Sequence, residues 1–237
     1  HTLLSEWTRA IFHPDDDALL NYLNDDGMSI EPEYYMPILP MLLVNGCSGI
    51  GTGWSTNVPS FNPTDIIGKL RRLLQHEPYG EPLVPWVRGF RGHVEGPIKT
   101  TKTSKNQSYT SVSYRIFGKV EWLSGNVLHI SEIPYTTKYD TYKTFVHAEA
   151  FKGKILDIHE AHKNDHVSFK LTLSDDFAAN MKENDPKYER PNLWRVFRLV
   201  SSEQVNMTCF NAEGKICKYE NTEDIIREFF DARMDLY

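Results

Sequence analysis

The order of apolar and polar residues along this 237-residue chain predicts a mixture of helices and antiparallel strands. Some segments repeat apolar residues every three or four positions, the period of one helix face. Others alternate polar residues with β-branched or aromatic ones, which is typical of strands. The helical pattern covers 3–12, 18–23, 63–74, 140–151, 175–184 and 222–237, with a short amphipathic element at 193–199. The strand pattern covers 90–94, 109–116, 119–123, 127–130, 155–159 and 167–173, with a hairpin of 207–211 and 215–219.

Capping and turn residues set several of these boundaries. Asn62 followed by Pro63 places a capping side chain and a proline at the start of a helix. Ser174 and Thr222 are expected to cap the helices that follow them. The polar tract 101–108 shows neither period, and we expect it to be a mobile hairpin loop.

One segment breaks both patterns. The apolar run 37–44 stops at Asn45, and glycines follow at positions 46, 49, 51 and 53. Glycine is needed where the backbone takes up a positive φ or approaches another group closely. Ile50 is the bulky apolar residue carried among them. From the residues alone, Ile50 is either a packed loop residue or an exposed apolar wedge, the kind of side chain that bends DNA by entering a base step.

Composition leaves the class of partner open. Hydrophobic residues make up 40% and charged residues 24%, which is ordinary for a soluble globular protein. The net charge of −6 argues against nucleic acid, because phosphate contacts need Lys and Arg. Charge is unevenly distributed, however. Acidic residues cluster at 15–17, 25–26 and 175–176, whereas basic residues gather at 69–72, 88–91 and 99–105.

Several features limit what the chain can be. No apolar run approaches the roughly 20 residues needed to cross a bilayer, so we expect no membrane partner. The three cysteines lack CxxC spacing, which favours free thiols in a reducing compartment and no structural zinc. The nearest metal-like spacing, His159 to His162, is weak, and no HExxH, GxSxG or Walker motif occurs. We therefore expect neither a catalytic residue nor a metal site in this chain.

Four segments in order carry a resemblance to a known family. The first is PMLLVNGCSGIGTGWSTNVPSFNP, residues 40–63, which is similar to a motif in the DNA-cleavage core of type IIA topoisomerases. HISEIPYTTKYDTY (129–142), WRVFRL (194–199) and EDIIREFFDARMDLY (223–237) resemble further segments of that family. The resemblance spans essentially the whole chain and is closest to the eukaryotic enzymes.

The resemblance implies an α+β fold in three parts. Residues 1–38 would be the C-terminal part of a winged-helix domain. Residues 39–212 would form a mixed α/β tower domain with an antiparallel sheet. Residues 213–237 would be the end of a hairpin and the start of a coiled-coil arm.

The resemblance also assigns roles to residues. Ile50 matches the family isoleucine that inserts between base pairs and bends the duplex. His1 and Thr2 match the end of the family segment that holds the nucleophilic tyrosine. The tyrosine is therefore expected two residues before His1, and no catalytic residue is expected in this chain. The expected DNA contacts are Asn45, Gly46, Gly49, Gly51, Thr52, Gly53 and Ser55 on the loop, and Arg198, Ser201, Ser202 and Asn206 further along.

The residues themselves leave alternatives at these places. The stretch 198–207 is equally compatible with a turn at the base of a sheet. The basic positions Lys69, Arg71 and Arg72 suit either a solvated helix face or a phosphate-facing surface. The large aromatic residues are expected in the core rather than stacked on bases; they are Trp54, Phe61, Trp86 and Trp194.

For function, the resemblance implies part of an ATP-dependent type II topoisomerase. Such enzymes cut one duplex, pass another through it and reseal the break. The resemblance places Mg²⁺ and ATP outside this chain, and implies double-stranded DNA as the partner, a homodimer and a nuclear location. The alternatives are a non-catalytic DNA-bending or scaffold module and an inert structural domain at a protein interface.

Overall fold

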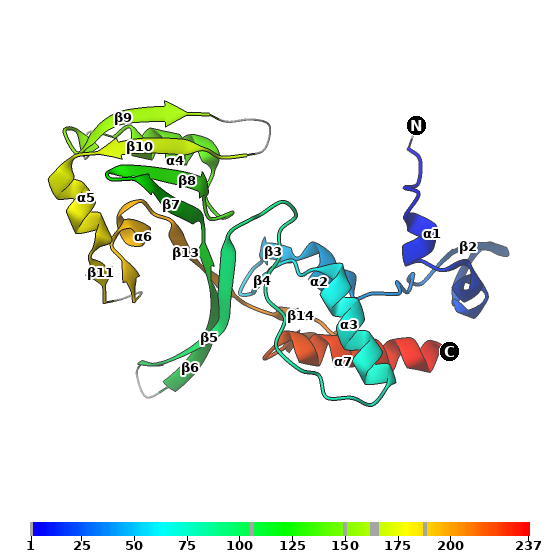
Figure 1. Ribbon diagram of the computed structural model, residues 1–237. Coiled ribbons are helices and arrows are strands. Elements are labelled where there is room, and N and C mark those ends of the chain that lie inside the picture. The colour runs from blue at the N-terminus through cyan, green and yellow to red at the C-terminus, as the bar shows by residue number, and fades with distance from the viewer. Residues whose placement is uncertain (1, 105–106, 149–150, 162–165, 187–188) are drawn as a thin grey trace. The chain divides into compact units, whose positions relative to one another are not determined.

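The computed structural model describes residues 2–104, 107–148, 151–161, 166–186 and 189–237 (Figure 1). The chain folds into two compact units. Unit 1 contains His1–Trp86 and Val205–Tyr237, and unit 2 contains Val87–Gln204. Helices occur with antiparallel sheets in this structure, so the expected α+β class is confirmed.

Unit 1 is built from short hairpins and helices. Its two longest helices, α3 (Pro63–Leu74) and α7 (Thr222–Leu236), lie against each other. The remaining elements are α1 (Thr8–Ile11), a 3₁₀ helix (Pro14–Leu19), β1 (Tyr22–Asp25), β2 (Met28–Pro32), α2 (Met41–Asn45), β3 (Cys47–Ile50), β4 (Ser55–Val58), β14 (Thr208–Phe210) and β15 (Ile216–Lys218).

The core of unit 1 lies between α2, α3 and α7. Leu43, Phe61, Ile66 and Ile226 are fully buried there. Phe61 is thus a core residue, as expected. These side chains come from both stretches of unit 1, so the core itself joins the two distant parts of the chain.

Helix capping agrees with the sequence at one helix and differs at another. The Asn62 side chain accepts a hydrogen bond from the Thr64 amide at 2.9 Å, which confirms the predicted start of α3. At α7 the capping residue is Asn221, whose side chain accepts from the Asp224 amide at 3.0 Å. The prediction that Thr222 caps this helix is therefore wrong by one position. Thr222 is the first residue inside the helix and is buried.

The N-terminal pattern predicts more helix than the structure contains. Only α1 within 3–12 is helical, and its apolar neighbours Leu3, Leu4 and Trp7 are exposed. Of the helix predicted at 18–23, the residues after the 3₁₀ helix enter β1 instead. The turn after β1 explains the difference: Asp26 and Gly27 adopt positive φ and fold β2 back onto β1, so pairing replaces helix.

Unit 2 contains two antiparallel sheets. One has the order β7 (Lys119–Ser124), β8 (Val127–Glu132), β10 (Phe169–Leu173), β9 (Ile155–Glu160). The other has the order β13 (Val200–Val205), β6 (Gln107–Phe117), β5 (His93–Ser104). The strands predicted at 109–116, 119–123, 127–130 and 155–159 are confirmed, and that at 167–173 begins two residues later. The other elements are α4 (Tyr139–Val146), α5 (Asp175–Lys182), α6 (Leu193–Val196), β11 (Asn184–Asp185) and β12 (Arg190–Pro191).

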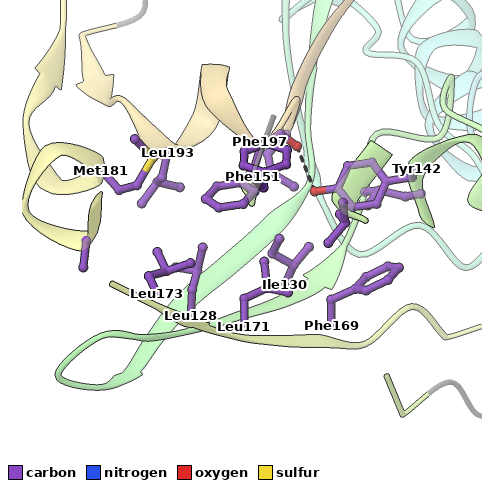
Figure 2. Close-up of a cluster of buried hydrophobic side chains, with 14 residues drawn as sticks. Leu128, Ile130, Tyr142, Phe151, Phe169, Leu171, Leu173, Met181, Leu193 and Phe197 are labelled. Atoms are coloured by element: carbon purple, nitrogen blue, oxygen red, sulfur yellow. Dashed lines mark hydrogen bonds between the residues drawn. The ribbon is translucent and has the colours of Figure 1, made fainter. Parts of the chain in front are cut away.

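The core of unit 2 lies between the four-stranded sheet and the helices (Figure 2). Alternate residues of β8 and β10 face it, because successive side chains of a strand point to opposite faces. Tyr142 of α4 reaches the same core, and its hydroxyl donates to the Phe197 carbonyl at 2.8 Å. Burial raises the pKa of Tyr142 far above its ordinary value.

The tract expected to be a loop is mostly strand. Within 101–108, residues 101–104 belong to β5 and 107–108 to β6; the tip, 105–106, lies outside the described residues. The two strands pair in register from Lys99 to Ser104. Threonines explain the error: Thr101 and Thr110 face each other with their hydroxyls 3.3 Å apart, and such β-branched pairs stabilise strands without any apolar alternation.

Candidate nucleic-acid interface

The four-glycine segment forms a tight hairpin, called here the glycine hairpin, residues 47–58. Its strands β3 and β4 pair with Ile50 opposite Ser55. The Gly51 amide donates to the Trp54 carbonyl at 2.8 Å and closes the four-residue loop. Gly53 adopts φ +80°, which side-chain-bearing residues rarely do. The Ile50 side chain is 94% exposed at the tip, so the exposed alternative, rather than the packed one, describes it.

Gly46 fixes the base of this hairpin. It ends α2 with φ +69°, and a Cβ at this position would lie 2.8 Å from the Val58 carbonyl oxygen and 3.0 Å from the Ser60 amide nitrogen. The turn from helix to hairpin therefore needs both the positive φ and the missing side chain of glycine. Because α2 also carries the fully buried Leu43, the hairpin is anchored directly to the core of unit 1.

Asn206 holds the hairpin from the far end of the chain. Its backbone pairs with Asn57, through N···O distances of 2.8 and 2.9 Å. Its side-chain Nδ2 donates to the Ser55 carbonyl at 2.7 Å and lies 3.1 Å from the Ser55 hydroxyl. Its Oδ1 accepts from the Thr208 hydroxyl at 2.7 Å. The sequence suggested a DNA contact for Asn206; in the structure its amide group fixes the strand that leaves the Ile50 tip.

An apolar groove runs beside the hairpin. It has a volume of about 670 Å³ and is lined by Ile50, Trp54, Phe210 and Ile216, among others. Trp54 is 58% exposed, so the expectation that it is a core residue is wrong. Trp54 is the last residue of the four-residue loop and lines the apolar groove instead of the core of unit 1.

The basic residues of α3 are partly committed to the protein itself. Lys69 Nζ donates to the carbonyls of Tyr79 and Glu81, and Arg72 donates to the Pro78 carbonyl. Desolvation by burial lowers the pKa of Lys69. These bonds hold the segment that follows α3, residues 78–81. Neither of the two sequence alternatives for the basic residues foresaw this role. Arg71 and Arg72 are both exposed, whereas Lys69 is half-buried.

Three of the expected contacts outside the loop, Arg198, Ser201 and Ser202, lie in unit 2. Arg198 follows α6 with φ +52°, and its guanidinium carbon lies 4.0 Å from the centroid of the Phe145 ring. The Ser201 hydroxyl lies 2.7 Å from the Thr136 hydroxyl, and Ser202 is exposed. Glu203 accepts a hydrogen bond from the Tyr135 hydroxyl at 2.7 Å, so this carboxylate has a partner inside the protein. Burial first, and then the Glu203 carboxylate, raise the pKa of Tyr135.

The whole chain, residues 1–237, matches the DNA gyrase/topoisomerase IV A-subunit family. The chain belongs to this family of type IIA DNA topoisomerases. The resemblance inferred from the four sequence segments is thereby confirmed.

Named relatives of this topoisomerase chain are eukaryotic. It is 38% identical over 242 residues to DNA topoisomerase 2 of Meyerozyma guilliermondii and 38% identical over 243 residues to that of Saccharomyces cerevisiae. Both matches cover 100% of this chain and 16% of the relative, so the chain spans about a sixth of their length.

A solved structure supports the same assignment. The Plasmodium falciparum topoisomerase II DNA-binding, cleavage and re-ligation domain superposes with a TM-score of 0.79 at 33% identity. The superposition covers 99% of this chain and 30% of that one. At this identity the likeness supports both the fold and the family of this topoisomerase chain.

The residues that sequence reasoning missed in this topoisomerase chain are supporting ones. Thr56 donates to the Asn206 carbonyl and also contacts the Cys209 sulfur at 3.7 Å. Thr208 orients the Asn206 amide. The only sequence signal was the proximity of Thr208 to Asn206, and their partners lie about 150 residues away, beyond the reach of a local pattern.

The described residues of the topoisomerase chain contain no group of three or more His, Cys, Asp or Glu side chains arranged to hold a metal ion. His159 is described, but His162 lies outside the described residues, so that pair is not tested. The three cysteines are free thiols, as expected. Among the described helices, none is long and apolar enough to cross a membrane.

Proposed function

We propose that this chain bends the duplex that a type II topoisomerase cleaves, with Ile50 as the wedge that enters a base step. The observation that carries this proposal is the 94% exposure of Ile50 at the tip of a hairpin held on several sides. A large apolar side chain so placed has no packing role in its own unit. Its exposure is explained if it is buried in a partner.

The stiffness of the hairpin supports a wedge. Unstacking one base step costs a few kcal/mol, and bending a short duplex by 40–90° costs on the order of 1–6 kcal/mol. A flexible loop would bend back from the duplex instead of separating the two base pairs of the step. The Gly51–Trp54 hydrogen bond, the packing of Gly46 against the Val58 backbone, and the Asn206 side chain all oppose such yielding.

The other contacts in the proposal are sequence-independent. The loop residues Asn45, Gly46, Gly49, Gly51, Thr52, Gly53 and Ser55 would approach phosphates through their backbone and short polar side chains. In unit 2, Arg198, Ser201 and Ser202 would do the same. Such contacts fix register on the duplex without reading base edges. Asn206 is proposed mainly as the support of the hairpin, because its side-chain amide is bonded to Ser55. Only the part of Asn206 that remains exposed would contact DNA.

The activity of the parent enzyme is part of the proposal. As its relatives are named DNA topoisomerase 2, we infer that the parent of this chain is an isomerase that cuts, passes and reseals duplex DNA. It would use ATP and Mg²⁺ bound outside these residues, with a nucleophilic tyrosine also outside them, and would act as a homodimer. A nuclear location is inferred from the eukaryotic relatives; one of them, from Dictyostelium discoideum, is named as mitochondrial.

The test is Ile50→Ala in this chain, with bending read from energy transfer between dyes at the two ends of a short duplex. We expect the wild-type chain to shorten the end-to-end distance and the variant to lose most of that change. The melting temperature should stay unchanged, because an exposed side chain stabilises little.

A matched control is Leu74→Ala, which truncates another exposed apolar residue of unit 1, on α3. This variant should bend DNA as the wild type does. Equal bending by wild type and Ile50→Ala would overturn the wedge. A wild-type chain that binds DNA without bending it would do the same.

A further inference from the structure

Two cysteines face each other across the β14–β15 hairpin. Cys209 and Cys217 are directly opposed in the antiparallel register. The pairs two residues away on either side are hydrogen-bonded: the Asn211 amide donates to the Lys215 carbonyl at 2.9 Å, and the Tyr219 amide donates to the Met207 carbonyl at 3.0 Å. Since pair types alternate along a ladder, Cys209 and Cys217 also form a hydrogen-bonded pair, with Cα atoms about 5.5 Å apart. Disulfides span Cα separations of about 4.4–6.8 Å, so the two Cα atoms lie within bridging range. The Cβ atoms of a hydrogen-bonded pair are about 5.5 Å apart and must approach by about 1 Å for the bond to form, which strains the disulfide and makes it easily reduced.

The pair is accessible to a small oxidant. Cys209 lines the apolar groove of about 670 Å³ beside the glycine hairpin. Neither Cys209 nor Cys217 is buried completely, and both are free thiols. Burial raises the pKa of the Cys209 thiol, which disfavours its thiolate as the first nucleophile.

The position of this pair gives its oxidation a structural consequence. The β14–β15 hairpin connects the glycine hairpin to α7. On one side, Cys209 contacts Thr56 of β4 at 3.7 Å. On the other side, the Glu228 carboxylate of α7 accepts from the Tyr219 hydroxyl at 2.7 Å and from the Ala212 amide at 2.8 Å. A covalent bond between β14 and β15 would stiffen the link between the Ile50 tip and α7.

We propose that Cys209 and Cys217 are a redox modification site, forming a reversible cross-strand disulfide with a disulfide such as oxidised glutathione as the oxidant. The Cys217 thiolate attacks one glutathione sulfur, forming a mixed disulfide and releasing one glutathione thiol. The Cys209 thiolate then attacks the Cys217 sulfur and releases the second glutathione thiol. Two protein thiols are oxidised and one glutathione disulfide is reduced to two thiols, and excess glutathione reverses the reaction.

Cys47 provides an internal comparison. It is the most exposed of the three cysteines, but its register partner on β4 is Val58 rather than a thiol. If exposure alone decided oxidation, Cys47 would react first and form mixed adducts. If the register decides, Cys209 and Cys217 pair while Cys47 stays outside the bond.

The experiment is peptide mapping of the whole chain after equilibration in buffers of set glutathione ratio. The samples are quenched by acid, alkylated and digested with trypsin without reductant. Cleavage after Lys215 separates Cys209, in peptide 199–215, from Cys217, in peptide 216–218; Cys47 lies in peptide 10–69. We expect peptides 199–215 and 216–218 to be joined by a disulfide as the ratio of oxidised to reduced glutathione is raised. This bond should form at a ratio about tenfold lower than the ratio at which Cys47 forms any disulfide.

Variants and amide exchange complete the test. Cys47→Ser should leave the joined peptides unchanged, and Cys217→Ser should abolish them. Oxidised wild-type chain should show slower amide hydrogen exchange in β14 and β15 than reduced chain. The same mixture of pairings in folded and in denatured chain would overturn the proposal, as would glutathione adducts without joined peptides. None of these readouts uses DNA, so their failure is distinct from failure of the DNA-bending proposal.

Discussion

Gly46 lies where α2 turns into the glycine hairpin, and the backbone around it leaves no room for a side chain. Gly46→Ala would place a methyl group 2.8 Å from the Val58 carbonyl oxygen and hold a non-glycine residue at φ +69°. We expect a loss of about 1–3 kcal/mol in unfolding free energy from this backbone strain, measured by chemical denaturation. Gly49→Ala is the control, because a Cβ there meets nothing within 4 Å. Equal losses in the two variants would contradict this account of Gly46.

Asn206 shows what a supporting residue contributes to an exposed tip. Asn206→Asp keeps an oxygen that accepts from Thr208 but removes the donor to the Ser55 carbonyl and sets a carboxylate against it. We expect a stability loss of about 1–3 kcal/mol, typical of an acceptor left unpaired, together with reduced bending of DNA in the energy-transfer assay. The bending defect should appear although Ile50 itself is unchanged.

The charge change needs its own control. Asn24→Asp adds the same negative charge on β1, where the Asn24 side chain accepts from the Gly27 amide at 3.0 Å. Bending by this variant should match the wild type. If both variants bend DNA equally poorly, net charge rather than the support of the hairpin explains the defect.

At the scale of elements, Tyr142 ties α4 to the end of α6 through its bond to the Phe197 carbonyl. Its pKa is raised in the folded chain, chiefly by burial, whereas an unfolded tyrosine ionises near pH ~10. Below that pH both states are neutral and the contribution of Tyr142 to stability is complete. Above it only the unfolded state loses the proton, so stability falls as pH rises. Melting temperatures measured from pH 8 to about pH 11 should decline at the alkaline end.

Tyr142→Phe separates this effect from general alkaline unfolding. The variant loses the hydrogen bond and should be less stable near neutral pH, by about 0.5–1.5 kcal/mol. Its alkaline decline should be shallower than that of the wild type. Tyr135 has a raised pKa as well and should account for part of the remaining slope. Identical slopes for the two proteins would show that Tyr142 does not titrate with unfolding.

Local chemistry in the sequence predicted the elements that depend on neighbouring residues. The Asn62 cap and the alternation of β8 and β10 are of this kind, as is the glycine-rich loop around Ile50, although the pairing of β3 with β4 was not predicted. The polar end of the β5–β6 hairpin, residues 101–104 and 107–108, was mistaken for a loop because threonines stabilise strands without apolar alternation. The residues alone left open whether Ile50 is packed or exposed, and only the family resemblance pointed to an exposed tip. The support of the tip was not foreseen, because Asn206 acts on Ser55 across 151 positions. Nothing local in either segment encodes that contact.

At the scale of the whole molecule, the chain leaves unit 1 after Trp86 and returns at Val205. The buried cluster of unit 2 is drawn entirely from residues between Leu128 and Leu199. That of unit 1 uses residues on both sides of unit 2, up to Ile226. Unit 2 is thus a continuous insertion with a core of its own, and independent folding requires little more.

We therefore expect residues 87–204 to fold when expressed alone, with a cooperative thermal transition. Leu171→Ala, at a fully buried position of β10, should lower the stability of this piece by about 2–5 kcal/mol. In the whole chain the same substitution should move one of two calorimetric transitions, and Ile226→Ala, fully buried in unit 1, should move the other. A single transition shifted equally by both substitutions would show instead that the two cores unfold as one. The two stretches of unit 1 are separated in the sequence by more than a hundred residues of unit 2. If the units unfold separately, the core that these two stretches share must hold unit 1 together by itself.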